Sequence, residues 1–307
     1  MRKTCLDKVY EMAQKDSRIV FIGSDLGVGT LDKFKKEIPD RFLMEGISEG
    51  HLIGMAAGLA LEGNIVYINT IAVFLTRRCF EQIALDLCLH NLNVRLIGSG
   101  GGLVYAPLGP THLAIEDMAI LRTLPNMTII APADADEMGK IMPLTLAHEG
   151  PIYIRLAKGG DALVSPKDAH YEIGKALPIR EGGDALIITT GIALQIAIKA
   201  AEYLETQGIK AAILHAHTVK PLDREAILAR CETTSVVVTV EEGVLNGGLG
   251  SSVAEILAEA NFNPSKRFAR IGLPDEFSHH YGSQAELLEH YGITPQKVAE
   301  VVTRLVG

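Results

Sequence analysis

The chain has 307 residues, of which 48% are hydrophobic and 21% charged, and its formal net charge is −8. At about 100–200 residues per domain, this length predicts two domains. The acidic balance argues against a nucleic-acid surface. The sequence has no run of about 18 apolar residues, which is the length that a membrane-spanning helix needs. Four cysteines without C-x-x-C spacing make no disulfide framework, and the charged first residues lack the apolar core of a signal peptide. We therefore expect a cytoplasmic protein that handles small molecules.

Short β-rich runs alternate with helical patterns along the first half of the chain. After a helical start, strands are expected at 18–23, 64–70, 94–98, 127–131 and 151–156. Helices are expected at 48–62, 74–91, 115–124 and 135–148, with a long loop at 99–110. Such alternation predicts a parallel sheet covered by helices.

A polar stretch from Lys158 to Tyr171 interrupts this pattern and predicts a linker before a second α/β unit. Strands are expected there at 185–190, 211–215, 235–241 and 268–271. Helices are expected at 192–207, 224–230 and 250–260, and two more close the chain. The predicted fold class is therefore α/β, with two domains that are each a mostly parallel sheet flanked by helices.

Two glycine-rich segments follow predicted strands, where ligands bind in open parallel sheets. Residues 23–30 (GSDLGVGT) contain Asp25, but they match neither the phosphate-loop motif nor the dinucleotide-binding motif. A simple turn between strand and helix explains them equally well. Residues 99–102 (SGGG) begin the long loop that leads to His112.

Glu49 stands at the head of a predicted helix that is rich in small residues. Ser48 is placed to cap this helix, and a carboxylate in its first turn would be stabilised by the helix dipole, which is a purely structural role. Glycines recur every four residues at 50, 54 and 58, although each costs about 1 kcal/mol in a helix relative to Ala. Such a stripe indicates close approach of another backbone, and burial there would suit Glu49 to sharing a proton.

Further side chains near the ends of strands suit a binding site. The turn sequence 109–111 (GPT) presents His112 just before a helix. Phe74 and Arg77 stand at the head of another predicted helix, and Arg155 lies at the end of a strand. Taken singly, an aromatic residue is more typical of a core, and a lone histidine more typical of a structural role.

Together, these segments resemble the C-terminal half of the transketolase and 1-deoxyxylulose-5-phosphate synthase family, which uses thiamine diphosphate. Residues 46–49 (GISE) resemble the family's G-[IV]-x-E, and residues 74–82 resemble its F-L-x-R…Q stretch. Residues 109–112 (GPTH) match the transketolase motif, and residues 241–251 resemble the E-E…G-G-x-G-S of the last domain. Several motifs in order over essentially the whole chain are far more specific than any one of them.

The resemblance implies a pyrimidine-binding domain at 1–160, a linker at 161–175 and a C-terminal transketolase domain at 176–307. It implies that Glu49 is the catalytic glutamate that hydrogen-bonds N1′ of the aminopyrimidine, so that the amino group can deprotonate the thiazolium. Phe74 would stack on the pyrimidine.

The resemblance also implies further contacts. Ile47, Arg77 and Gln82 would complete the cofactor contacts on this chain. His112 would act on the substrate in catalysis, and Asp25 and Arg155 would line the substrate site.

The family binds the diphosphate through a metal ion held by a G-D-G…N motif in a separate N-terminal domain, and this chain has no such motif. We therefore expect no metal ligand here. The resemblance implies a partner chain that carries the motif and holds Mg²⁺ or Ca²⁺, so that thiamine diphosphate is shared between the two chains. The expected assembly is an α₂β₂ heterotetramer built on paired copies of this chain.

Two positions depart from the family pattern and bear on the substrate. Leu108 stands where the family carries an Asp that recognises a sugar hydroxyl, and Gly100 stands where transketolase carries a second histidine. An unpaired hydroxyl there would cost about 1–3 kcal/mol. These departures point to a modified sugar, or to a smaller or more apolar carbonyl compound.

The resemblance implies that the chain is the C-terminal subunit of a split transketolase. Such an enzyme transfers a two-carbon ketol unit from a ketose to an aldehyde through a thiamine diphosphate carbanion. The alternatives are an acyloin-forming enzyme like deoxyxylulose-phosphate synthase and a 2-oxo acid dehydrogenase β subunit, against which the sequence at 110–112 counts. A non-catalytic subunit is a further alternative, against which Glu49, Phe74 and His112 together count.

Overall fold

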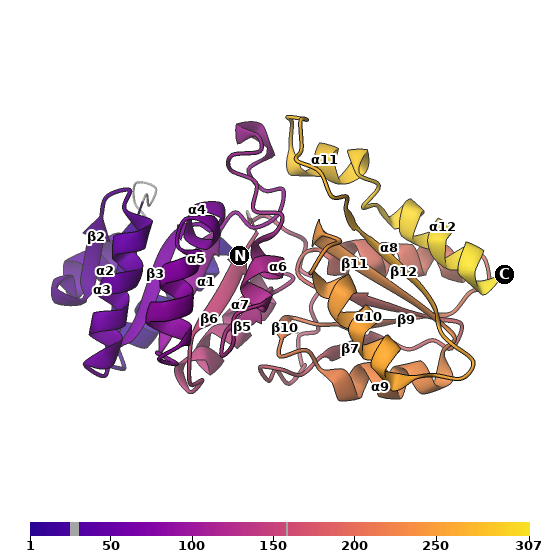
Figure 1. Cartoon of the computed structure of the whole chain (residues 1–307), viewed down its shortest axis with the longest axis horizontal. Helices are drawn as coiled ribbons and strands as arrows, with labels where there is room; N and C mark the ends of the chain where they lie inside the picture. The colour runs from indigo at the N-terminus through magenta and orange to yellow at the C-terminus, as the bar shows by residue number, and fades with distance from the viewer. Residues whose placement is uncertain (25–30, 158) are drawn as a thin grey trace.

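The computed structural model describes residues 1–24, 31–157 and 159–307. Two α/β lobes lie side by side, and each is built on a twisted sheet flanked by helices (Figure 1). This arrangement confirms the predicted fold class. No helix in the described part of the chain is long and apolar enough to cross a lipid bilayer.

The sheet of the first lobe has the strand order β10-β5-β6-β4-β3-β1-β2. Its six parallel strands are β1 (Ile19–Ser24), β2 (Phe42–Glu45), β3 (Ile65–Ile71), β4 (Val94–Ser99), β5 (Thr128–Ile130) and β6 (Ile152–Leu156). All are buried except β2, which lies at the edge. Because the strands are parallel, their carboxyl ends meet at one edge of the sheet, and the loops that follow them converge there.

The first lobe contains seven α-helices between its described strands and before β1. They are α1 (Arg2–Ala13), α2 (Asp32–Glu37), α3 (Glu49–Leu61), α4 (Ala72–Arg77), α5 (Phe80–Gln82), α6 (Asp117–Arg122) and α7 (Ala135–Ile141). The predicted helix at 74–91 is divided, since Cys79 leaves helical backbone angles and residues Ile83–Cys88 form a π-helical turn. The predicted helix at 135–148 narrows to a 3₁₀ turn after Ile141, because Pro143 has no N–H to continue the α-helix.

The second lobe is built on the strand order β12-β11-β8-β9-β7. Its strands are β7 (Leu177–Arg180), β8 (Ala185–Thr189), β9 (Ala211–His215), β11 (Val236–Val244) and β12 (Arg267–Leu273), and only β7 is antiparallel to its neighbour. Its helices are α8 (Ala193–Thr206), α9 (Arg224–Thr233), α10 (Leu249–Ala260), α11 (Gln284–His290) and α12 (Pro295–Val306). The sequence pattern had not predicted β2, β7 or β10.

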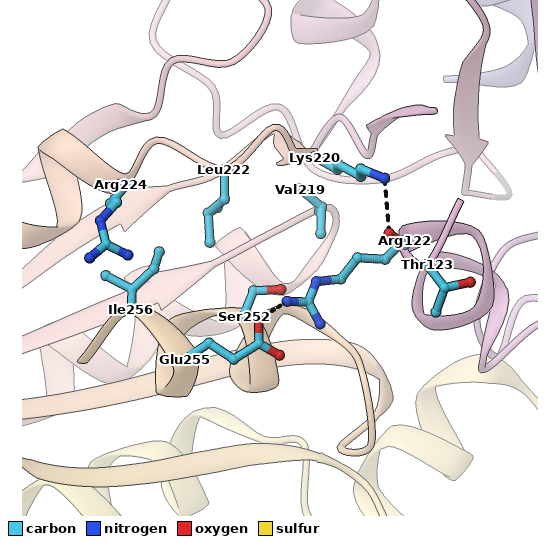
Figure 2. A pocket seen from close by; sticks show the side chains of 9 residues that line it. All are labelled: Arg122, Thr123, Val219, Lys220, Leu222, Arg224, Ser252, Glu255 and Ile256. Carbon is cyan, nitrogen blue, oxygen red and sulfur yellow. Dashed lines mark hydrogen bonds and ion pairs between the residues drawn. The ribbon is translucent and has the colours of Figure 1, made fainter. Parts of the chain in front are cut away.

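Strand β10 (Thr218–Lys220) joins the two lobes, because it follows β9 in the chain but pairs antiparallel with β5 of the first sheet. The ammonium group of Lys220 donates to the backbone carbonyl of Arg122 at 2.9 Å (Figure 2). It also donates to the backbone carbonyl of Leu124, just after α6. The guanidinium of Arg122 pairs with Glu255 of α10. The lobes are therefore tied by both backbone and side-chain contacts.

His217 lies at this junction with its imidazole fully buried. Its Nδ1 lies 3.0 Å from the Thr218 hydroxyl, and its Nε2 has no hydrogen-bond partner within the described residues. Burial lowers the pKa of His217 to about 4, against the opposing effect of the Glu137 charge. The folded chain therefore holds this imidazole neutral.

We predict that the junction makes stability sensitive to mild acid. The unfolded chain takes up a proton at His217 below about pH 6.5, whereas the folded chain does so only near pH 4. Protonation of the unfolded chain should therefore lower the free energy of unfolding by about 2 kcal/mol between pH 7 and pH 5. A His217→Asn variant should lose about 2 kcal/mol less over this range in urea titrations. The same change at exposed His90 is the control. Equal pH dependence of the His217 variant and the wild type would contradict the prediction.

Candidate active site

Glu49 begins α3 directly after β2, at the carboxyl edge of the first sheet. Its side chain is 5% exposed, which is rare for a carboxyl group and needs a polar partner. Ser48 occupies the N-cap position, but its hydroxyl makes no capping bond and lies 3.4 Å from the carbonyl of Gly46. The predicted side-chain cap is therefore wrong, and Glu49 itself is the polar group at this helix start.

Two rings converge near Glu49. Phe74 on α4 is half-buried, and its ring meets that of His112 edge-on, with centroids 5.2 Å apart. The Arg78 guanidinium lies 3.9 Å from the centroid of the Phe74 ring and donates to Oε2 of Glu49 at 3.3 Å. The structure thus brings together three residues that the sequence analysis treated in separate motifs, Glu49, Phe74 and His112.

Arg78 was not assigned a role from sequence, although a signal was present. It follows Phe74 by four residues, a spacing that places both side chains on one face of a helix. Arg77, three residues after Phe74, shares that face by the same rule. The spacing therefore points to both arginines, and the tertiary contacts of Arg77 with Glu116 and Leu113 leave Arg78 as the one that reaches the Phe74 ring.

Gln82 on α5 supplies a polar atom that lacks a partner. Its Oε1 is buried and accepts no hydrogen bond from the described residues, and its amide carbon would lie 3.9 Å from a side chain placed at Gly50. Gln82 therefore lies against the first turn of α3, one residue from Glu49. Ile47, by contrast, is 76% exposed. A buried carboxyl, an aromatic face that a planar group already covers and an orphaned amide oxygen fit the edge and face of a planar heteroaromatic ring.

Arg77 is held by the segment that follows His112. Its guanidinium pairs with Glu116 and donates to the carbonyl of Leu113 at 3.1 Å. These contacts fasten α4, which carries Phe74, to the His112 loop. They support a positioning role for Arg77, and the cofactor contact expected from the sequence stays a prediction.

Arg155 is likewise part of a buried network. Its Nε donates to Oδ2 of Asp117 at 2.9 Å, its Nη2 donates to the Ala114 carbonyl at 3.1 Å, and the Tyr153 hydroxyl donates to the same Oδ2 at 2.7 Å. The Arg155 side chain is 7% exposed and that of Asp117 is fully buried. These contacts support a structural role for Arg155, and the substrate contact expected from the sequence stays a prediction.

The loop before His112 is anchored by the second lobe. Glu242 of β11 is buried, accepts from the backbone N–H of Leu103 at 2.9 Å and accepts from Gln284 at 2.7 Å. Gly102 has φ +65°, and a Cβ there would lie 2.5 Å from the Glu242 carboxyl, so only glycine lets the loop approach. Gly102, one of the glycines that the sequence associated with a site, therefore serves this close packing.

Asp25 lies outside the described residues. Within residues 1–24, 31–157 and 159–307, no three His, Cys, Asp or Glu side chains are grouped so as to hold a metal ion. The residues expected to contact the pyrimidine end of the cofactor all lie within the described part of the chain.

A pocket of about 510 Å³ lies between the lobes, but its lining contains none of the residues expected in the site (Figure 2). It is lined by Arg122, Thr123, Val219, Lys220, Leu222, Arg224, Ser252, Glu255 and Ile256. Its basic groups are each engaged, since Arg122 pairs with Glu255, Arg224 pairs with Glu259 and Lys220 caps α6. The residues that line this pocket therefore connect the two lobes.

Comparison with known proteins identifies the family to which a chain with this fold belongs. The family model for the transketolase pyrimidine-binding domain matches residues 1–160, and that for the transketolase C-terminal domain matches residues 174–298. The chain belongs to the transketolase family.

Relatives that match nearly from end to end include two proteins named as transketolase subunits. The chain is 38% identical to the 6-deoxy-6-sulfo-D-fructose transketolase subunit SqwH of Clostridium sp. strain MSTE9, over 97% of this chain and 92% of the relative. It is 36% identical to an apulose-4-phosphate transketolase subunit of Phocaeicola vulgatus, over 99% and 97% of the two chains. A 1-deoxy-D-xylulose-5-phosphate synthase of Heliobacterium modesticaldum is 37% identical, but the match covers only 46% of that protein. The expected family and subunit type are confirmed.

A solved structure agrees with this match. A split-gene transketolase, described as an inactive beta4 tetramer, superposes with a TM-score of 0.91 at 37% identity, over 99% of this chain and 97% of that chain. A transketolase from Pichia stipitis shares the fold at a TM-score of 0.75, over 45% of its length.

We predict that the Arg155–Asp117 pair acts on the fold. Asp117→Asn leaves a buried guanidinium without its counter-charge and should lower the free energy of unfolding by about 3–5 kcal/mol, measured by urea denaturation. The double variant Asp117→Asn/Arg155→Met should lose less than the sum of the single changes, because it removes both charges. Additive losses would show that the two side chains do not interact.

Proposed function

We propose that this chain binds the aminopyrimidine end of thiamine diphosphate and is active only with a partner subunit. The observation that carries the proposal is the convergence of buried Glu49, the Phe74 ring face and the orphaned Oε1 of Gln82 at one edge of a parallel sheet. The family match to a pyrimidine-binding domain over the same residues supports it. When bound, thiamine diphosphate supplies the nucleophilic carbon and the electron sink for ketol transfer.

Each residue has a defined task in this proposal. Glu49 shares a proton with the ring nitrogen N1′, which its burial favours because no water competes for the carboxyl group. Phe74 fixes the plane of the ring by stacking. Gln82 offers an acceptor to the exocyclic amino group.

His112 is proposed as the catalytic residue on the substrate side. It is half-buried, its Nδ1 lies 2.9 Å from the Thr111 hydroxyl, and its ring edge faces Phe74. An imidazole there can donate to a substrate carbonyl or hydroxyl and hold it beside the cofactor ring.

The partner is proposed to supply the other half of the site. It would carry the G-D-G…N motif and hold Mg²⁺ or Ca²⁺, which would bind the diphosphate. The assembly proposed is an α₂β₂ heterotetramer in which copies of this chain pair. Within the described residues, nothing lies within 4 Å of a Cβ built at Gly54 or Gly58, so this stripe of α3 can receive another backbone. The related beta4 tetramer, described as inactive, agrees with a need for the partner.

The substrate is proposed to be a modified or phosphorylated ketose, with an aldehyde as acceptor. Leu108 is 51% exposed on the His112 loop and cannot accept a hydrogen bond from a sugar hydroxyl. The relatives named for 6-deoxy-6-sulfo-D-fructose and apulose-4-phosphate act on unusual ketoses. We place the enzyme in the cytoplasm, where its four free and buried cysteines stay reduced.

The proposal predicts that Glu49 is essential for turnover. Glu49→Gln keeps the size of the side chain but not its capacity to share a proton as a carboxyl, so kcat of the two-chain complex should fall at least about 100-fold. Ketol transfer is measured by product formation, and thermal unfolding checks that the variant folds. Glu62→Gln, at the exposed end of α3, is the matched control. Full activity of the Glu49 variant would contradict the proposed role.

The shared site predicts that cofactor binding depends on the partner. The purified chain with Mg²⁺ should show no calorimetric binding of thiamine diphosphate at micromolar concentration, because it lacks the group that holds the diphosphate. Addition of the partner subunit should produce binding at one cofactor per pair of chains. Tight binding to this chain alone would contradict the shared site.

A further inference from the structure

The Arg78 guanidinium contacts both groups that the proposed function assigns to the cofactor ring. It donates to the Glu49 carboxyl at 3.3 Å and stacks over the Phe74 ring at 3.9 Å from the centroid. No other described cation lies over the Phe74 ring. One planar group therefore uses the buried acid and the aromatic face at the same time.

A guanidinium and an aminopyrimidine place similar demands on such a site. Both are flat, both hydrogen-bond in their own plane, and both stack on an aromatic face. A carboxyl group beside a phenyl face satisfies either of them. The two cannot use the same acid edge and ring face together.

We propose, on the basis of the proposed function, that Arg78 occupies the pyrimidine position of the cofactor-free chain and withdraws when thiamine diphosphate binds. Arg78 then has two effects of opposite sign. It supplies the counter-charge that Glu49 needs in the empty site, and it competes with the cofactor ring and lowers its affinity.

The positions of the three side chains make this exchange feasible. Arg78 is the C-cap of α4 and its side chain is 52% exposed, so the guanidinium can turn into water without movement of the helix. Glu49 is 5% exposed and cannot follow it. Without Arg78, the empty site would bury a carboxylate that has no other ion-pair partner among the described residues. Arg77, in contrast, is fixed by Glu116 and Leu113.

The test measures the affinity of the two-chain complex for thiamine diphosphate, with Mg²⁺, by calorimetry. Arg78→Ala should bind the cofactor about three- to thirtyfold more tightly than the wild type, since an exposed cation–π contact and an ion pair no longer have to be broken. Arg78→Lys should give a smaller gain, because an ammonium keeps the charge but lacks the planar face. Arg18→Ala removes a comparable exposed arginine from an ion pair with Asp16 and should leave the affinity unchanged.

A second measurement tests the contact without cofactor. In the free chain, Arg78→Ala should lower the urea midpoint of unfolding in the wild-type background. The same substitution should lower the midpoint less in a Glu49→Gln background, because there the loss of Arg78 leaves no carboxylate unpaired. This readout does not depend on the proposed function.

The outcomes separate the two claims. Tighter binding in Arg78→Ala together with a smaller midpoint shift in the Glu49→Gln background supports the exchange, and a merely structural role could not improve affinity. Unchanged or weaker binding in Arg78→Ala, or equal midpoint shifts in both backgrounds, overturns the exchange alone. A wild-type complex that binds no thiamine diphosphate overturns the proposed function and, with it, the exchange.

Discussion

The site depends on one buried acid, the carboxyl group of Glu49, at the point where β2 gives way to α3. A carboxylate that is almost out of contact with water must have a hydrogen-bond or ionic partner, because its transfer from water is otherwise costly. In this chain the partner is the flexible side chain of Arg78. Glu49 can therefore bind a ligand that replaces the Arg78 guanidinium. This requirement limits the candidate ligands to flat groups with a donor or a basic nitrogen on one edge.

The second lobe has a structural part in this site. The buried core of that lobe includes Leu103, Ala106 and Leu113, which belong to the loop on either side of the turn that presents His112. Glu242 adds a hydrogen bond to the same loop. Near the tip, a Cβ at Gly109 would lie 2.6 Å from the Tyr281 ring, so the segment before α11 packs on the turn, and both segments project from the same side of the molecule (Figure 1). The second lobe thus positions the proposed substrate residue, while the first carries the proposed cofactor contacts.

The elements with strong local patterns were the ones that sequence could predict. The long apolar runs of β1 and β3 and the helix after Ser48 were found within one or two residues of their observed bounds. Strand β10 was not, because it has three residues and its pairing with β5 is decided by how the lobes meet. Residues 23–30 gave a pattern that allowed either a site or a turn, and Asp25 lies outside the described residues.

The sequence predicted the site residues with similar limits. Glu49, Phe74 and His112 were singled out by type and spacing, and they do converge. Arg77 and Arg155 had the right charge for an anion contact, but their partners, Glu116 and Asp117, are supplied by tertiary packing at the head of α6. Such pairing leaves no trace in local sequence. A positive side chain near a predicted site therefore says little about a ligand until its buried partners are known.

The central claim is that Glu49 and Phe74 receive the aminopyrimidine, and a structure of the two-chain complex with thiamine diphosphate tests it most directly. The account predicts N1′ within about 3 Å of a Glu49 carboxyl oxygen, the ring stacked on Phe74 and the Arg78 guanidinium turned away from both. A cofactor ring bound elsewhere, with Arg78 still in contact with Glu49 and Phe74, would contradict it.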